Sequence, residues 1–291
     1  MARTRGTANE VSGKVVAISG AARGIGRATA EAFLAAGAKV AIGDLDADLA
    51  AKTAAELEGP AHVGTRVVGL PLDVTEPASF AAFLAAAEAE LGPLDVLVNN
   101  AGIMPTGLFA EEDPAMTARI LGINLGGVIN GSRLAAECFT SRGTGHLVNI
   151  ASLAGVSGFP GLATYCASKH AVVGFTESLH RELRVHGVGV TAVLPGVVRT
   201  ELSAGANTPA WTEAITTVDP EDVARAIVRV VGSERPLVTV PRSLGATLKT
   251  MSLLPYRLRG LAEKATGAST AYTQADPVAR EAYHQRLRRQ A

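Results

Sequence analysis

The stretch from Asn149 to Ala171 contains a tyrosine and a lysine whose spacing suits acid–base chemistry. Tyr165 is the first tyrosine in the chain, and Lys169 is the only lysine between Lys52 and Lys249. At positions i and i+4 of a predicted helix, two such side chains share one face. An ammonium group beside a phenol favours loss of the phenol proton near neutral pH. The pair therefore indicates a site of proton transfer.

The magnitude of this effect can be checked. A free tyrosine has a pKa near 10, so ionising it at neutral pH requires about 4 kcal/mol. An ammonium about 4–5 Å away, at an effective dielectric constant near 20, supplies about that amount. The spacing therefore predicts that Lys169 lowers the pKa of Tyr165. Considered alone, Tyr165 is better interpreted as a packed tyrosine of a helix, and the nearby Ser152 is better interpreted as a helix-capping or turn serine.

Alternating strands and helices must position these residues. Short apolar runs predict strands at 14–19, 39–43, 66–74, 94–102, 145–152, 188–196 and 236–240. Helical patterns fall between them, at 27–37, 46–58, 76–90, from about 112 to 139, at 163–186 and at 220–232. This alternation is typical of parallel βαβ units with right-handed crossovers. The sequence predicts an α/β fold with a doubly wound, parallel, seven-stranded sheet, helices on both faces and a helical C-terminal tail.

A glycine-rich loop follows the first predicted strand. Gly20, Gly24 and Gly26 lie between that strand and a helix, where a phosphate-binding loop belongs. Glycines let the backbone approach a pyrophosphate closely, and a helix N-terminus offers unpaired N–H groups. An ordinary tight turn is the simpler alternative. A second signal, Asp44 at the end of the next predicted strand, favours a dinucleotide site, because a carboxylate there can bind the adenosine ribose diol.

The same aspartate bears on the choice between the two nicotinamide cofactors. A carboxylate at this position repels a 2′-phosphate, so Asp44 favours NAD(H) over NADP(H). Arg23 in the glycine loop leaves NADP(H) open as the alternative, since a guanidinium there can meet a 2′-phosphate. We expect the close-range repulsion by Asp44 to outweigh Arg23.

Composition excludes several other classes. Hydrophobic residues make up 47% of the 291 residues, and the formal net charge is zero, which gives no reason to expect a nucleic-acid partner. The two cysteines, Cys138 and Cys166, and the histidines lack metal-ligand spacing, so we expect no metal. The first residues lack the apolar core of a secretory signal, and no apolar run has membrane-spanning length. A soluble cytoplasmic protein is expected.

The chain resembles the short-chain dehydrogenase/reductase family in its shorter, single-domain form. The motifs that carry the resemblance come in the family's order over residues 12–241. They are SGAARGIG (19–26), Asp44, LDV (72–74), NNAG (99–102), Asn124 in INLGG, NIAS (149–152), Tyr165-Cys-Ala-Ser-Lys169 and PGVVRT (195–200). Two residues depart from the family pattern: Ser19 stands where threonine is usual, and Ala151 replaces a serine often found there.

The resemblance implies a Rossmann-type, NAD(P)-binding catalytic domain at residues 1–241 that transfers a hydride between NAD(P) and a carbonyl or secondary alcohol. Tyr165 would be the general acid/base, and Ser152 would hydrogen-bond the substrate oxygen. Lys169 would bind the nicotinamide ribose and lower the pKa of Tyr165, while Asn124 would hold a water in a proton relay. The implied cofactor-binding residues are Gly20, Arg23, Gly24, Ile25, Gly26, Asp44, Leu45, Asp73, Val74, Asn100, Ala101, Gly102, Tyr165, Lys169, Pro195, Gly196, Val198 and Thr200. Homodimers or homotetramers are also implied.

The substrate pocket should lie at the carboxyl ends of the fourth to sixth strands. The residues expected to line it are mostly apolar: Met104, Pro105, Leu153, Ala154, Phe159, Leu162 and a loop at 197–218 with Leu202 and Trp211. We therefore expect an apolar alcohol or ketone as substrate. Two alternatives to this oxidoreductase are an NAD(H)-binding regulatory protein without catalysis, and an epimerase or dehydratase on the same scaffold.

The C-terminal extension, residues 242–291, has a basic and apolar segment at 243–264. Leu244, Leu248 and Met251 could share a helix face before Pro255 interrupts it. We expect the extension to pack on its own domain, on the pocket or on a partner subunit, in preference to the alternative of a membrane contact. A final helix is predicted in ADPVAREAYHQRLRRQ.

Overall fold

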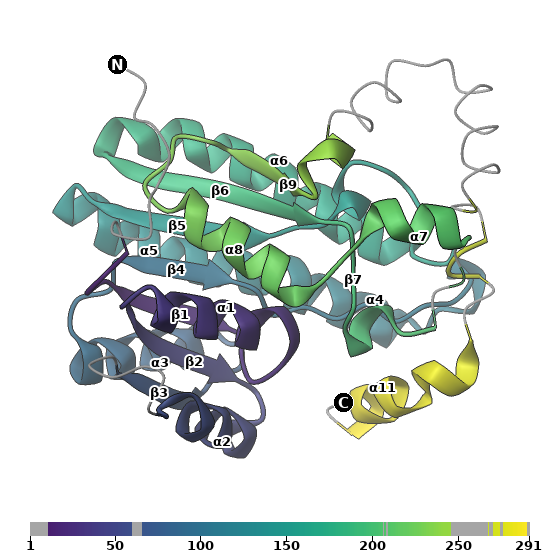
Figure 1. Ribbon diagram of the computed structural model, residues 1–291, viewed down its shortest axis with the longest axis horizontal. Helices are drawn as coiled ribbons and strands as arrows, with labels where there is room; N and C mark the ends of the chain where they lie inside the picture. The colour runs from purple at the N-terminus through teal and green to yellow at the C-terminus, as the bar shows by residue number, and fades with distance from the viewer. Residues whose placement is uncertain are drawn as a thin grey trace.

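A seven-stranded parallel sheet forms the centre of the protein, in the order β3-β2-β1-β4-β5-β6-β9 (Figure 1). The computed structural model describes residues 11–59, 66–205, 207, 209–245, 267, 270–273 and 276–289. The strands are β1 (Val15–Ser19), β2 (Lys39–Asp44), β3 (Val67–Pro71), β4 (Val96–Asn99), β5 (Gly145–Ile150), β6 (Val188–Pro195) and β9 (Leu237–Val240). The predicted fold class and its seven strands are confirmed.

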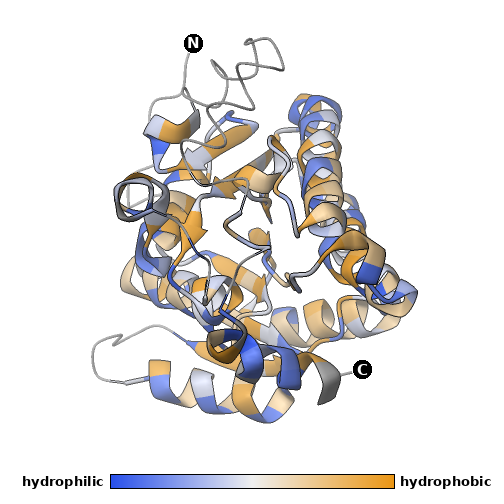
Figure 2. Cartoon of the chain, turned by 90° about the vertical axis from the view of Figure 1, so that its right-hand side faces the viewer, coloured by the Kyte–Doolittle hydropathy of each residue, from blue (hydrophilic) through white to orange (hydrophobic). Residues whose placement is uncertain are grey.

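Helices cover both faces of this sheet. The α-helices are α1 (Gly24–Ala35), α2 (Ala47–Leu57), α3 (Pro77–Leu91), α4 (Pro114–Leu121), α5 (Gly127–Arg142), α6 (Ala163–Leu183), α7 (Ala210–Thr216), α8 (Pro220–Val230) and α11 (Pro277–Arg289). Short 3₁₀ turns are η3 (Phe109–Glu111), η5 (Leu153–Gly155), η6 (Arg184–His186) and η7 (Glu201–Ser203). Seen from the side on which the strands end, hydrophilic residues gather mainly on the outer faces of the helices (Figure 2).

Two hydrophobic cores, one on each face of the sheet, hold the layers together. Along β1, Val16 and Ile18 pack with α1, α2 and α8, whereas Val15 and Ala17 pack with α3, α5 and α6. Because both faces are buried, the strands are continuously apolar instead of alternating. Burying each valine or isoleucine is worth about 1.5–3 kcal/mol, so both cores favour this arrangement.

The strand order reverses beside β1, which pairs with β2 on one side and β4 on the other. In open α/β sheets, ligands bind beyond the carboxyl ends of the strands at such a reversal. The glycine loop follows β1, and the NNAG motif follows β4. The topology therefore brings these two segments together at one edge of the sheet.

The helix predicted from about residue 112 to 139 is wrong as a continuous α-helix. It starts at Pro114 after the capping residue Asp113, and a π-helical segment, η4 (Gly122–Gly126), separates α4 from α5. Asn124 lies within η4. Such π segments occur frequently at functional sites, because the inserted residue changes which side chains face inward.

A second, two-stranded sheet was not predicted. In it β7 (Val197–Val198) pairs in parallel with β8 (Thr217–Val218). These strands join the two ends of the predicted substrate loop, which contains η7 and α7 between them. The loop is therefore fixed at both stems.

The C-terminal helix α11 lies beyond the carboxyl ends of the strands (yellow in Figure 1). Of the segment predicted to be amphipathic at 243–264, Leu244 is buried against α6 and β6 residues, while Leu248, Met251 and Pro255 lie outside the described residues. The division of the chain at residue 241 stays a prediction. In the part of the chain that the structure describes, no helix has both the length and the apolar character needed to cross a bilayer.

Candidate active site

A cavity of about 440 Å³ opens beside the glycine loop, at the reversal of strand order. Many of the predicted cofactor residues line it: Gly20, Arg23, Gly24, Ile25, Asp44, Leu45, Asp73, Val74, Asn100, Ala101, Gly102 and Thr200. Pro195, Gly196, Val198, Tyr165 and Lys169 line the adjoining cavity described below. The remaining predicted cofactor residue, Gly26, lies behind this lining.

The glycine loop is held by close backbone contacts. Gly20 and Gly24 have positive φ angles of 62° and 56°, which favour glycine. A side chain at Gly26 would place a Cβ only 2.5 Å from the Gly20 carbonyl oxygen. Asn100 Nδ2 donates to that carbonyl at 2.8 Å, and the backbone N–H of Asn100 donates to Ser19 Oγ at 3.0 Å. The loop and the NNAG motif are thus joined, and serine retains the hydroxyl function expected at Ser19.

The carboxylate of Asp44 is fixed at the end of β2. Its Oδ2 accepts a hydrogen bond from Ala22 N at 3.2 Å, and its Oδ1 accepts one from Asp46 N at 3.2 Å. Arg23, the residue that left NADP(H) open, has Nη2 at 3.4 Å from Asp46 Oδ2. Its charge is therefore partly balanced by a second carboxylate beside the cavity.

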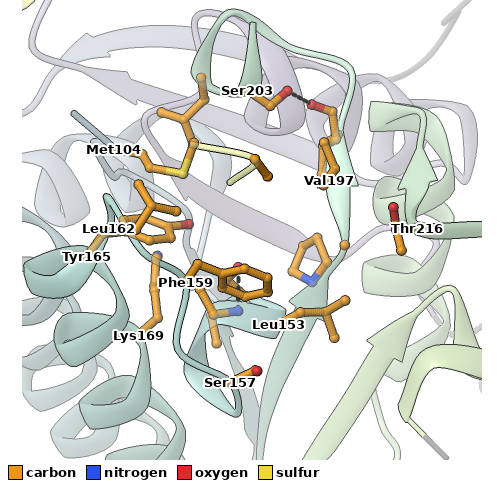
Figure 3. A pocket seen from close by; sticks show the side chains of 18 of the residues that line it. Met104, Leu153, Ser157, Phe159, Leu162, Tyr165, Lys169, Val197, Ser203 and Thr216 are labelled. Atoms are coloured by element: carbon orange, nitrogen blue, oxygen red, sulfur yellow. Dashed lines mark hydrogen bonds between the residues drawn. The ribbon is translucent and has the colours of Figure 1, made fainter. Parts of the chain in front are cut away.

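The tyrosine–lysine pair lies on α6 and lines the substrate cavity that adjoins the first cavity (Figure 3). Tyr165 is 6% exposed and Lys169 is 4% exposed. Lys169 Nζ donates to the Ile150 carbonyl oxygen at 2.8 Å and lies 5.7 Å from the centre of the Tyr165 ring. Ser152 follows β5, and its Oγ accepts a hydrogen bond from Ala154 N at 3.1 Å. The predicted catalytic residues thus converge from β5 and α6.

Burial dominates the protonation of this pair. It raises the pKa of the Tyr165 phenol above its ordinary value, although the nearby Ser152 hydroxyl lowers that pKa in part. The same burial lowers the pKa of Lys169 to about 8. In the protein alone, the phenol is therefore protonated at neutral pH. The lysine effect predicted from spacing does not by itself ionise Tyr165.

Asn124 is fully buried behind the NNAG loop. Its Oδ1 accepts a hydrogen bond from Ile103 N at 2.8 Å, and its Nδ2 donates to the Ile103 carbonyl oxygen at 2.9 Å and to Ser168 Oγ at 3.2 Å. Both amide hydrogens are used in these contacts. Any water held by this side chain would have to donate to Oδ1.

A second cavity, of about 340 Å³, adjoins the first and contains the predicted substrate residues. The two cavities share five lining residues: Ile25, Asn100, Gly102, Thr200 and Leu202. The predicted residues that line the second cavity are Met104, Ser152, Leu153, Ala154, Phe159, Leu162, Leu202 and Trp211. Pro105 was also predicted to line this cavity, but the structure does not place it in the lining. In Figure 3 the Tyr165 hydroxyl and the Lys169 ammonium point into the space bounded by Met104 and Phe159.

Sequence reasoning named the pocket as one place where the C-terminal extension could pack, but it did not identify the residues that line the two cavities. Ala271 and Tyr272 line the substrate cavity. The Tyr272 and Phe159 rings pack edge to face there, with their centroids 6.1 Å apart. Further residues line the cofactor cavity: Arg119 from α4, and Tyr283, Arg286 and Leu287 from α11. One signal was available, because three of the four tyrosines lie after residue 255 in a chain with few aromatic residues.

Comparison with known proteins agrees with this geometry. A family model described as short chain dehydrogenase matches residues 14–211. Probable oxidoreductase EphD of Mycobacterium tuberculosis is 36% identical over 85% of this chain and 44% of its own length. The chain thus spans less than half of that relative. The 2-(S)-hydroxypropyl-CoM dehydrogenase 3 of Xanthobacter autotrophicus is 36% identical over 79% of this chain and 94% of its own length.

A solved structure is also similar. The crystal structure of a short-chain type dehydrogenase/reductase from Mycobacterium marinum superposes with a TM-score of 0.69 and 29% sequence identity, covering 80% of this chain and 96% of that chain. Since the family model covers more than half of the chain and a full-length relative exceeds 30% identity, the protein belongs to the short-chain dehydrogenase/reductase family.

Proposed function

We propose that the protein is an oxidoreductase that transfers a hydride between NAD(H) and a carbonyl or secondary alcohol of an apolar small molecule. The observation that carries this proposal is that the cavity lined by Tyr165 and Lys169 adjoins a second cavity, with which it shares Ile25, Asn100, Gly102, Thr200 and Leu202. One cavity is bounded by a glycine loop and a fixed carboxylate, and the other is mostly apolar. The Xanthobacter relative is named as a dehydrogenase of a 2-hydroxypropyl group, which is a secondary alcohol.

The residues of the first cavity fit a dinucleotide. The glycine loop leaves room for a pyrophosphate at the N-terminus of α1, where unpaired N–H groups favour an anion. Asp44 is positioned to accept hydrogen bonds from the adenosine ribose, and Lys169 lines the adjoining substrate cavity. Bound NAD⁺ would supply the hydride acceptor and a positive charge next to the phenol.

Tyr165 would act as the general base in the alcohol-oxidising direction. The alcohol proton would pass to the ionised Tyr165 oxygen, and the hydride of the carbinol C–H bond would pass to NAD⁺, so that the products would be a ketone, NADH and a protonated tyrosine. Ser152 would donate a hydrogen bond to the substrate oxygen. Because burial raises the pKa of Tyr165, the base form requires nearby positive charge, which Lys169 supplies together with the cofactor. Asn124 would hold a water that links this proton to solvent.

The proposal can be tested with secondary alcohols of graded size and hydrophobicity. We expect NADH to form from NAD⁺ with apolar secondary alcohols, at a rate that falls by about 10²–10⁴-fold in Tyr165→Phe, the usual size of a general acid/base contribution. Binding of NADH by this variant should match the wild type. If the wild type binds NADH but oxidises none of the alcohols and reduces none of the matching ketones, the regulatory alternative is favoured.

The preference for NAD(H) rests on Asp44. Its carboxylate is held at the end of β2 by two backbone N–H groups, and Arg23 is engaged with Asp46. We expect Asp44→Ala to lower the ratio of kcat/KM with NAD⁺ to kcat/KM with NADP⁺ by about tenfold or more. The substitution removes the short-range repulsion between the carboxylate and the 2′-phosphate of NADP⁺. Asp48→Ala, which removes an exposed carboxylate from the first turn of α2, is a matched control that leaves Asp44 and the Arg23–Asp46 pair in place. An unchanged ratio in Asp44→Ala would exclude this residue as the source of discrimination.

A further inference from the structure

The C-terminal helix α11 carries a buried arginine that joins two loops of the active site. Arg280 is 1% exposed. Its Nη2 donates to the Met104 carbonyl oxygen at 2.8 Å, and its Nη1 donates to the carbonyl oxygens of Leu202 at 3.2 Å and Ala204 at 3.0 Å. One guanidinium thus binds the segment that follows β4 and the segment that contains η7.

Tyr283, one turn further along α11, reinforces this contact. Its hydroxyl accepts a hydrogen bond from Met104 N at 2.8 Å, so α11 holds both the N–H and the carbonyl of Met104. The Arg280 guanidinium lies 5.5 Å from the centre of the Tyr283 ring, within the range of a cation–π interaction. The backbone of Met104 is therefore fixed from one side by this helix.

The last turns of α11 make a second set of contacts at the edge of the cofactor cavity. Arg119 Nη1 on α4 donates to the Leu287 carbonyl oxygen at 2.6 Å, and Arg286 forms an ion pair with Glu201. Helix α11 is thereby attached both to α4 and to η7. Its position depends on two elements that border the cofactor cavity.

These contacts connect the two cavities. Met104 and Leu202 line the substrate cavity, while Leu202, Tyr283 and Arg286 line the cofactor cavity. A displacement of α11 would therefore alter the walls of both cavities together.

The buried charge of Arg280 depends on carbonyl groups from both active-site loops. Among the residues that the structure describes, Arg280 has no acidic partner, and burial lowers its pKa below the ordinary arginine value. A buried charge without a counter-ion is strongly unfavourable unless dipoles compensate it. Here the compensating dipoles are three carbonyl groups from two loops. Moving either loop away from α11 would therefore remove part of this compensation.

We propose that α11 is a cofactor-linked clasp, and that Arg280 is a positioning residue that fixes the Met104 and Leu202–Ala204 segments for binding of both dinucleotide and substrate. A cofactor bound in this cavity would contact the wall formed by Tyr283, Arg286 and Leu287, so its binding would favour this position of α11. This inference depends on the proposed NAD(H) site. It adds the C-terminal helix to that site as a coupling element.

Hydrogen exchange of the full-length wild-type protein, with and without NADH, tests the coupling directly. We expect NADH to slow exchange at backbone amides of both the glycine loop and residues 280–287. Protection of the glycine loop without any change in α11 would overturn the clasp and leave the proposed function intact. No protection at either place would count against the NAD(H) site itself, and with it against the clasp.

Substitutions at Arg280 test the positioning role. Arg280→Met keeps similar length without charge or donors, and Arg280→Lys keeps the charge without the planar fork. We expect Arg280→Met to raise the dissociation constant of NADH and the KM for an oxidised secondary alcohol by about tenfold or more, since several charge-assisted hydrogen bonds are lost. Arg280→Lys should fall between Arg280→Met and the wild type. Arg225→Met, an exposed arginine on α8, is the matched control and should leave both constants unchanged.

The split between these constants and kcat separates positioning from general destabilisation. A merely unstable variant loses active protein and lowers apparent kcat, whereas a misplaced cavity wall raises KM and the NADH dissociation constant. Folded Arg280→Met with wild-type values for both would overturn the proposal. If Arg280→Met does not fold, Tyr283→Phe removes only the hydroxyl that binds Met104 N, and we expect it to raise both constants about threefold or more. Unchanged constants in Tyr283→Phe would likewise overturn the proposal.

Discussion

The two ends of strand β5 contain buried polar groups that are used in opposite ways. At its start, His146 is 2% exposed, and at its end the chain leads through Ile150 to Ser152, beside Tyr165 and Lys169. Both clusters lie at strand β5 and are buried to a similar degree. At the first end every polar atom of the His146 ring has a protein partner. At the second end the Tyr165 hydroxyl and the Lys169 ammonium point into a cavity (Figure 3).

The environment of His146 fixes one neutral tautomer. Gly232 N donates to Nδ1 at 3.2 Å, so the ring hydrogen is on Nε2 and is donated to Thr191 Oγ1 at 3.0 Å. The Thr191 hydroxyl in turn donates to the Arg235 carbonyl oxygen at 2.7 Å. A second ring proton would face the Gly232 N–H. Burial lowers the pKa of His146 to about 4, with His180 and Lys14 adding repulsion.

The hydrogen bonds of His146 stabilise the fold, whereas the Tyr165 hydroxyl and the Lys169 ammonium are available to a ligand in the cavity. A closed hydrogen-bond chain lowers the free energy of the folded state. A buried ammonium that faces a cavity raises it, because desolvation is incompletely compensated. Substitutions at the two ends of β5 should therefore change different measured quantities.

The largest effect is expected at Lys169. Lys169→Met should reduce turnover by about 10²–10⁴-fold, since the charge beside the phenol is lost. The same change should stabilise the fold at pH 7 by about 1–2 kcal/mol, measured by urea unfolding. The folded pKa of about 8 lies below the unfolded value of 10.5, so the buried ammonium disfavours folding at pH 7. If Lys169→Met were inactive and also less stable than the wild type, the proposed difference between the two ends of β5 would be wrong.

A smaller effect, on stability alone, is expected from His146 at acidic pH. Its folded pKa of about 4 lies below the unfolded value of 6.5, so the unfolded chain binds the proton first. The contribution of His146 is fully present above pH 6.5 and is lost as the pH falls towards 4, by about 3 kcal/mol. Urea unfolding of the wild type and His146→Gln at neutral and acidic pH measures this. Equal acid sensitivity in the two proteins would assign the loss to other groups.

The smallest changes are two matched hydroxyl deletions. Thr191→Val leaves the His146 Nε2–H without its acceptor and should cost about 1–3 kcal/mol of stability, with unchanged turnover. Ser152→Ala removes a hydroxyl that caps only the short η5 turn, so it should cost less than about 1 kcal/mol but reduce turnover by about tenfold or more. Parallel unfolding and rate measurements test the pair. If both variants lost stability equally and neither lost turnover, the two ends of β5 would not differ in role.

The sequence predicted those parts of the molecule that depend on local patterns. Both faces of the central strands are buried, so continuous apolar runs marked these strands, and the edge strands β3 and β9 were recognised from apolar runs although they are only partly buried. The helical spacing of Tyr165 and Lys169 placed both side chains on one face of α6. The π segment around Asn124 was missed, because a shift of one hydrogen-bond position leaves no trace in the apolar pattern.

Other features depend on the path of the chain and could not be read from short segments. The pKa of Tyr165 is governed by burial under surrounding elements, which residue spacing does not report. The contacts of Arg280 join residues far apart in sequence, so the sequence named the pocket as one possible packing place for the extension but not the residues that Arg280 binds. The predicted roles of Asn124, Ser152, Tyr165 and Lys169 stay predictions, and the substitutions at Ser152, Tyr165 and Lys169 described above test three of them.

The small parallel sheet of β7 and β8 has a consequence for how the protein can change over evolutionary time. Val197 and Val198 pair with Thr217 and Val218, so the chain leaves the core and returns to it at one fixed point. Residues between these stems can be exchanged or lengthened without moving β6 or α8, which lie outside the pairing. Helix α7, which lines the substrate cavity through Trp211 and Ile215, is the part of this segment that can be exchanged without disturbing the Arg280 contacts at Leu202 and Ala204. New specificity can arise there while Tyr165 keeps its place.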